Sequence, residues 1–199
     1  MKKFTKIAIA GVCLVAVGVG IIFALKDRTP NNYDLSGNWI NHQETFEEAV
    51  QNSTQVVYAK VVDKESFWFN GIVFTEAEIE ILENFKGVLQ QGDKCFVRFT
   101  GGVIDGEEHY MERQIIPEIS EEYVFVINEF SMADEVPVEG KYVLVGGYQG
   151  MFKMENGIIG QMLGQDDEHK KVVKLNDENV LEKELLGKSL SEIRKLVKQ

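Results

Sequence analysis

Cysteine, histidine and basic residues are scarce in this chain, and each scarcity removes a class of structure or function. The 199 residues include two cysteines, Cys13 and Cys95. Cys13 lies in an apolar N-terminal stretch, so a domain formed by residues 29–199 has one cysteine and no internal disulfide. Cys95 alternates with Val97 and Phe99, which predicts a small buried apolar side chain and not a nucleophile.

The shortage of basic residues excludes nucleic acid as a partner. The chain has 21 Lys and Arg against 32 Asp and Glu, and five of the basic residues but one acidic residue fall within the first 28. Residues 29–199 therefore carry 16 bases, 31 acids and a net charge of −15. A surface of this charge repels phosphate backbones and anionic lipid headgroups.

Catalytic and metal-binding patterns are also missing from the sequence. The histidines, His42, His109 and His169, are far apart in polar segments that we expect to be exposed, and none has a partner at zinc-ligand spacing. Neither G-x-S-x-G nor S-x-x-K occurs. We therefore predict no catalytic residue, no metal site and no cofactor.

One long apolar run, Ile7–Leu25, predicts a membrane-spanning helix. A helix of this length would be roughly 28 Å long, close to the thickness of a bilayer's hydrocarbon core. Three lysines precede the run, so the N-terminus is expected in the cytoplasm and residues 29–199 outside the cell membrane. The alternatives are a cleaved signal, for which Ile22–Ala24 is a poor site, and a lipoprotein cut before Cys13, which follows Val12. A retained single-pass signal-anchor in a bacterial envelope is favoured.

Strand-like segments separated by glycine-containing turns fill most of the remaining chain. Gln55–Val62 is rich in β-branched residues, and Val73–Ile81 alternates apolar and mostly acidic residues over its whole length. Asn70-Gly71 between aromatic segments is a strong hairpin signal, and turns are also expected at Gly101-Gly102 and Asp105-Gly106. Further strands are expected at Lys94–Thr100, Glu108–Gln114, Glu122–Ile127, Lys141–Val145 and Met151–Met154. The spacing favours a mainly β, antiparallel barrel and also suits a small sandwich.

Short helices are expected on either side of the strands. Glu44–Val50 has an apolar face, and Ser189–Glu192 is a capping box that opens a helix with one apolar stripe. The expected organisation is an anchor at 1–28, a tether and short helix at 29–52, a barrel at 53–165, and a C-terminal extension ending in a helix at 166–199.

The order of short motifs from Gln55 to Met162 resembles a loose family of secreted bacterial domains related to the netrin-module and tissue-inhibitor-of-metalloproteinase fold. These motifs are Gln55–Val62, Glu83–Gly87, Gly101-Gly102, Ser120–Phe125, Gly147–Phe152 and Glu155–Gly157. The resemblance implies a five-stranded OB-like barrel with terminal helices. Animal inhibitors of this fold use a free N-terminal cysteine to bind the protease zinc, and this chain has no cysteine at the start of its outer part.

Two features are candidates for binding a partner. Phe67, Trp68, Phe69 and Phe74 place aromatic side chains on both faces of the predicted hairpin, so one set is either covered by a terminal helix or exposed. The Gly146–Gly150 loop adds Tyr148 and Gln149 as candidates. A ladder of Glu76, Glu78 and Glu80 is either a solvated strand face or a surface for a basic partner or loosely bound divalent cations.

These observations predict a membrane-anchored, non-enzymatic module that recognises an envelope protein or peptide. Two alternatives stay open. One is a cell-wall polymer hydrolase with a pair of carboxylates roughly 5–10 Å apart. The other is a structural or assembly protein of the envelope, for which the anchor and tether matter most.

Overall fold

The computed structural model describes residues 33–35, 42–111, 114–131, 137–165, 172–174 and 179–198. The predicted anchor Ile7–Leu25 and His169 lie outside these residues. In the part of the chain that is described, no helix is both long and apolar enough to span a membrane. The elements are β1 (Tyr33–Leu35), α2 (Phe46–Gln51), β2 (Gln55–Phe69), β3 (Ile72–Lys86), β4 (Lys94–Ile104), β5 (Glu107–Met111), β6 (Glu122–Ser131), β7 (Pro137–Leu144), η1 (Gly147–Gly150), β8 (Met151–Glu155), β9 (Ile158–Ile159), β10 (Leu163–Gln165), β11 (Val172–Lys174), α3 (Val180–Leu185) and α4 (Leu190–Val197).

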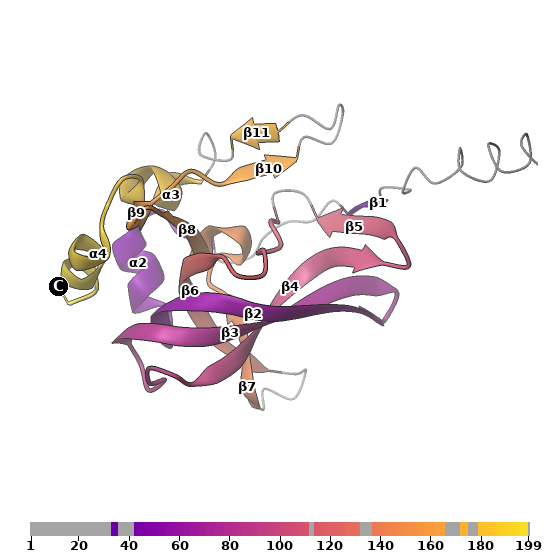
Figure 1. Ribbon diagram of the computed structural model, residues 1–199, viewed down its shortest axis with the longest axis horizontal. Helices are drawn as coiled ribbons and strands as arrows, with labels where there is room; N and C mark the ends of the chain where they lie inside the picture. The colour runs from indigo at the N-terminus through magenta and orange to yellow at the C-terminus, as the bar shows by residue number, and fades with distance from the viewer. Residues whose placement is uncertain are drawn as a thin grey trace, which may run out of the picture. The chain divides into compact units, whose positions relative to one another are not determined.

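Five of the strands pair in a closed circuit. β2 pairs antiparallel with β3, and β3 pairs antiparallel with β4. β4 then runs parallel to β7, β7 pairs antiparallel with β6, and β6 returns antiparallel to β2. The chain is therefore mainly β, as predicted, with short C-terminal helices and a barrel-like sheet (Figure 1).

Alternating side chains fill the interior of this circuit. On β3 the odd-numbered residues from Val73 to Ile81 are buried and the even-numbered residues between them lie on the outer face, which confirms the predicted strand. Cys95 on β4 is 1% exposed, as predicted, and burial raises the pKa of its thiol to about 12. The larger side chains of this first core include Phe99, Phe125, Ile79, Ile81, Ile127 and Met151.

A second core lies between the outer side of β6 and β8 and the three α-helices. β6 is buried on both faces, because Tyr123, Phe125 and Ile127 belong to the first core and Val124 and Val126 to the second. A strand buried on both faces has a continuous run of apolar residues, and β6 has such a run from Tyr123 to Ile127. The apolar stripe of α4 packs on its own domain, as predicted.

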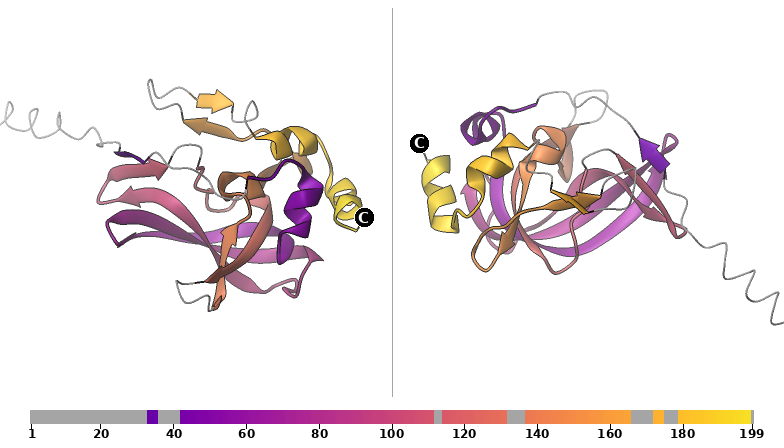
Figure 2. Two further views of the ribbon diagram at one scale, coloured as in Figure 1. Left: turned by 180° about the vertical axis from the view of Figure 1, so that it is seen from behind. Right: turned by 90° about the horizontal axis from the view of Figure 1, so that it is seen from above.

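The first expected helix is present with shifted ends, and the predicted capping box is confirmed. α2 begins at Phe46 instead of Glu44, because Thr45 caps it with a side chain that accepts a hydrogen bond from the Glu48 N–H at 3.1 Å. The capping box of Ser189 and Glu192 opens α4, with the Ser189 N–H donating to Glu192 Oε2 at 2.8 Å. Figures 1 and 2 show the three helices gathered at one end of the barrel-like sheet, with the β2–β3 and β4–β5 hairpins at the opposite end.

Three local expectations were wrong. Gly101-Gly102 is not a turn, because β4 continues through both glycines to the predicted turn at Asp105-Gly106. β2 runs unbroken from Gln55 to Phe69, with a bulge between Val61 and Asp63 instead of a gap between two strands. Residues 33–35, expected in the tether, form β1 parallel to β5.

The glycine pair lets β4 pass very close to β2 and β3. The Thr75 hydroxyl donates to the Gly101 carbonyl at 2.7 Å and lies 2.9 Å from the Ser66 hydroxyl oxygen. A Cβ atom at Gly102 would collide with both hydroxyl groups. Gly102 also has φ +143, a conformation that residues with a side chain rarely adopt.

We expect Gly102→Ala to lower the free energy of unfolding by about 2–4 kcal/mol, because it adds a steric collision to backbone strain. Gly106→Ala is the matched control, since Gly106 has φ +80 and open space around its Cβ position. The control should cost about 1–2 kcal/mol from strain alone. Urea unfolding followed by circular dichroism measures both, and equal losses would contradict this account of the glycine pair.

Candidate interaction surface

The hairpin formed by β2 and β3 carries two exposed aromatic side chains near its tip. Asn70 and Gly71 both have positive φ, as in the type I′ turns that join two strands tightly. Trp68 is 52% exposed and Phe69 is 44% exposed. Trp68 also contacts His109 of β5 edge to face, with 4.9 Å between ring centroids, so one side of the indole is supported. His109 itself is buried, and the expectation that it is exposed was wrong.

On the outer face of the hairpin, Phe67 and Phe74 form a supporting pair. They lie opposite each other in the β2–β3 register and stack with ring centroids 6.3 Å apart. Phe69 meets Phe74 edge to face at the same centroid distance. Both Phe67 and Phe74 are partly buried, so these rings fix the position of Phe69 more than they offer surface themselves.

Arg98 of β4 lies between these rings and a third one. Its guanidinium carbon is 4.2 Å from the ring centroid of Phe130, 5.4 Å from that of Phe67 and 5.9 Å from that of Phe74. At such distances a guanidinium is attracted to the electron-rich faces of the rings. Arg98 therefore covers the rings of Phe67, Phe74 and Phe130, and the helices of the described part of the chain pack elsewhere, in the second core.

Glu76 holds Arg98 in place. The carboxylate of Glu76 accepts hydrogen bonds from Arg98 and from Lys141 of β7, whose Nζ lies 2.8 and 2.9 Å from its two oxygens. Burial alone would raise the pKa of Glu76, but the hydrogen bonds from Lys141 and Arg98 outweigh burial and lower it. With side chains 16% and 14% exposed, Glu76 and Arg98 form an ion pair largely shielded from water.

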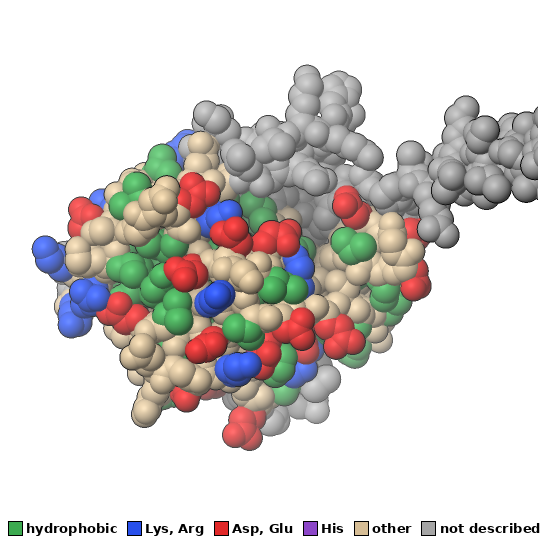
Figure 3. Space-filling model, viewed as in Figure 1, with side chains coloured by type: hydrophobic (Ala, Val, Ile, Leu, Met, Phe, Trp, Pro, Cys, Tyr) green, Lys and Arg blue, Asp and Glu red, His purple; other side chains and the backbone are tan. Residues whose placement is uncertain are grey.

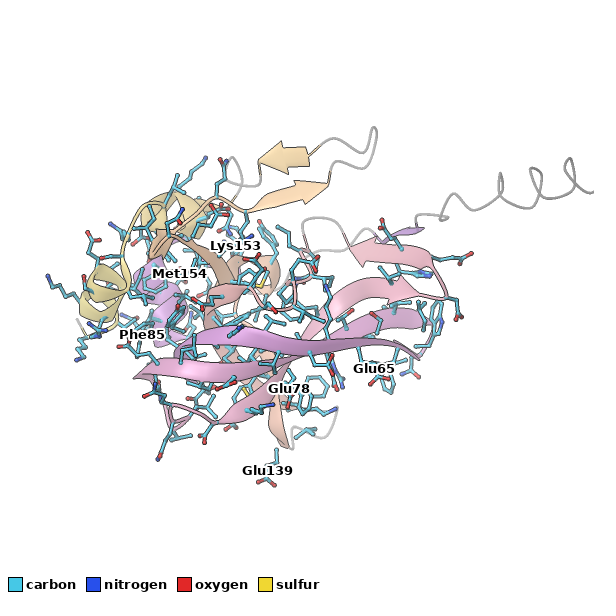
Figure 4. All side chains as sticks on the ribbon, viewed as in Figure 1. Glu65, Glu78, Phe85, Glu139, Lys153 and Met154 are labelled. Carbon is cyan, nitrogen blue, oxygen red and sulfur yellow. The ribbon has the colours of Figure 1, made fainter. Side chains whose placement is uncertain are left out.

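The predicted glutamate ladder is therefore largely neutralised within the molecule. Glu78 forms an ion pair with Lys94 at 3.6 Å, and Glu80 lies opposite Lys94 in the β3–β4 register. Figure 3 shows acidic, basic and apolar side chains interspersed over the face that includes β2 and β3. Figure 4 places Glu78 on this sheet, and places Glu65 on the part of β2 toward the hairpin tip.

Tyr148 and Gln149 do not belong to the exposed surface. Both are buried in η1, contrary to the expectation of a free glycine-rich loop. The Gln43 N–H donates to Gln149 Oε1 at 2.8 Å, and Gln149 Nε2 donates to the Gln43 carbonyl at 3.0 Å. The Gln149 side-chain amide thus makes the two hydrogen bonds that a neighbouring strand would make with the backbone of residue 43, so its role is structural.

A groove of about 560 Å³ lies beside this contact. His42, Gln43, Glu48, Asn52, Asn128 and residues 143–147 line it. Its amide side chains bond to one another and to nearby backbone, for example Asn52 Nδ2 to Gln43 Oε1 at 2.8 Å and Asn128 Nδ2 to the Asn52 carbonyl at 2.9 Å. Glu48 is the one carboxylate among these lining residues, so this groove does not supply the pair that the hydrolase alternative needs.

One further buried acid, Glu182 of α3, was missed by the sequence reasoning. Its side chain accepts the Met162 N–H at 2.7 Å, and burial raises its pKa. Glu182, Lys183 and Glu184 are three consecutive charged residues, a pattern that predicts exposure and not burial. Across the described residues, no group of three or more His, Cys, Asp or Glu side chains is placed to hold a metal ion.

The sequence matches no protein-family model and no curated protein sequence. The case for function therefore depends on the geometry of the hairpin end.

We expect Glu76→Gln to lower the free energy of unfolding by about 2 kcal/mol at pH 7, because Arg98 and Lys141 lose their shared carboxylate. The lowered pKa means that the contribution of Glu76 is complete above its ordinary value of 4.5 and is lost as the pH falls through the folded-state value. Urea titrations from pH 7 to pH 3 should therefore show the two proteins converging in acid.

Glu78→Gln is the matched control, because Glu78 has the same outward position on β3 but a longer and more exposed ion pair. It should change stability by less than about 0.5 kcal/mol at every pH. A loss for Glu76→Gln that stays constant down to pH 3 would contradict the ion-pair account.

Proposed function

We propose that this chain is a binding module, held at the outer side of a bacterial cell membrane by Ile7–Leu25, that recognises an envelope protein or peptide with the hairpin end of its barrel. One observation carries the proposal. Trp68 and Phe69 are exposed on opposite faces of one hairpin tip, where His109 supports Trp68 and stacked rings and Arg98 brace the face that carries Phe69.

Exposed aromatic residues on a rigid support are well suited to binding. Trp is among the residues that contribute most to the energy of protein interfaces. A side chain that is already positioned loses little conformational entropy when a partner binds. The contact of Trp68 with His109 and of Phe69 with Phe74 supplies this positioning.

The proposal includes an OB-like barrel related to the netrin-module and tissue-inhibitor fold. In support, β2 pairs with both β3 and β6, and the third and fifth of the five strands in chain order, β4 and β7, are parallel. A circuit of five strands with this one parallel pair is consistent with the OB-like expectation.

We expect Trp68→Ala and Phe69→Ala to reduce recovery of a crosslinked envelope partner about tenfold each, in line with the loss of an interface anchor. The measurement is crosslinking in cells that express the full-length protein, followed by purification and mass spectrometry. Because both side chains are about half exposed, the free energy of unfolding should fall by no more than about 1 kcal/mol.

Leu186→Ala is the matched control, since Leu186 is 46% exposed but follows α3 at the helix end of the barrel. It should leave partner recovery unchanged. Recovery at the normal level from both aromatic variants would overturn the proposed surface. Recovery that depends only on the identity of the membrane segment would favour the structural or assembly role.

A further inference from the structure

The half of β2 nearest the hairpin tip has an open edge. β6 pairs with β2 only from Gln55 to Lys60, and Glu121 and Ser120 bond to Val61 just beyond. From Asp63 to Phe69, no strand among the described residues pairs with the side of β2 that faces away from β3. Figure 1 shows this half of β2 as the outermost strand of the hairpin end.

The register of the hairpin shows which backbone groups face this edge. Phe69 and Ile72 flank a two-residue turn, so they form a hydrogen-bonded pair, and such pairs alternate along the two strands. The N–H and C=O groups of Glu65, Phe67 and Phe69 therefore point to β3. Those of Lys64, Ser66 and Trp68 point to the open edge, where the Lys64 N–H donates to the Asp63 carboxylate at 2.9 Å.

The side chains along the edge restrict what can pair with it. Asp63 and Glu65 are exposed, and the Lys64 ammonium is held by the Pro117 carbonyl at 3.0 Å and by Glu118 at 2.8 Å. Charged residues and a bulge commonly protect an open edge from indiscriminate pairing. Here the exposed acids Asp63 and Glu65 precede the segment Ser66–Phe69, which ends in exposed aromatic rings.

A second copy of this chain fits this edge poorly. Each copy carries a net charge of −15 over residues 29–199, so two copies repel each other. A segment with basic residues has the opposite charge, and cross-strand pairs of opposite charge stabilise a sheet. The acidic and the aromatic residues of β2 share one face, because their partners on β3 are the outward-facing residues. On that face of an added strand, basic side chains would therefore meet Asp63 and Glu65, and apolar side chains would meet Phe67 and Phe69.

We infer that the open edge of β2 binds an extended segment of the partner by adding it as a further β-strand, whose side chains along one face are basic at one end and apolar at the other. The inference rests on the proposed function and specifies how that surface recognises its partner. Backbone hydrogen bonds to Ser66 and Trp68 supply affinity in this mode, and the flanking side chains supply specificity.

Hydrogen exchange, followed residue by residue in the full-length protein in non-ionic detergent, tests this directly. Before any addition, the amides of Ser66 and Trp68 should exchange at least about tenfold faster than those of Phe67 and Phe69. The probe is a heptapeptide with valine at positions 1 and 3, lysine at positions 5 and 7, and serine between them, which added antiparallel places valine opposite the rings and lysine opposite the acids. Its binding should slow the two fast amides about tenfold or more and leave the other two unchanged.

The matched control is the same heptapeptide with methyl groups on all its central backbone nitrogens. It keeps the charge and side chains of the probe but cannot donate the backbone hydrogen bonds of a strand, so its affinity should fall at least about tenfold. Equal affinity of the two peptides would overturn strand addition. So would binding of the first peptide without protection of Ser66 and Trp68, or no binding at all.

A concentration-dependent dimer in which the amides of Ser66 and Trp68 are protected would also overturn the inference, by showing that a second copy occupies the edge. None of these failures decides the proposed function, because that is judged by whether crosslinking of the cellular partner depends on Trp68 and Phe69. Conversely, crosslinking that does not depend on Trp68 and Phe69, together with normal peptide binding, would overturn the proposed function and not strand addition.

Discussion

The parallel pairing of β4 with β7 is the contact on which the rest of the structure depends. It joins the third and fifth of the circuit's strands in chain order and so closes the sheet around a single apolar interior. It also brings Lys141 to Glu76, which lies opposite Arg98 in the β3–β4 register. Arg98, held by this carboxylate, stacks on the rings of Phe67, Phe74 and Phe130 and thereby stiffens the hairpin. The strand pairing that closes the sheet thus also completes the support of the candidate surface.

The two ends of the barrel-like sheet have different roles. At one end, the α-helices bury the outer side of β6 and β8, and Phe46 meets Phe152 with ring centroids 6.0 Å apart. That end contributes stability. At the other end, β2 and β3 extend to a tight turn whose last aromatic residues, Trp68 and Phe69, are about half exposed. The combination of an exposed aromatic tip and a strand edge makes this end the place where a partner is expected.

Features set by neighbouring residues were predictable from the sequence. The alternation along Val73–Ile81, the Asn70-Gly71 turn and the capping box at Ser189 each need only a few residues, and all are present. Features set by distant residues were not. The glutamate ladder looked unpaired because Arg98 reaches Glu76 only through the β3–β4 register and Lys141 only when β7 joins the sheet. Gln149 looked exposed because its partner, Gln43, lies more than a hundred residues earlier in the chain. Gly101-Gly102 looked like a turn. In the structure, β4 passes so close to Thr75 that residue 102 has no room for a side chain.

The central claim is that the hairpin end touches a partner and the helix end does not. The most direct measurement places a photoactivatable crosslinking residue at Phe69 in one strain and at Leu186 in another, with illumination of living cells. The account predicts a discrete covalent adduct from position 69 and none from position 186. No adduct from position 69, or the same adduct from both positions, would contradict it.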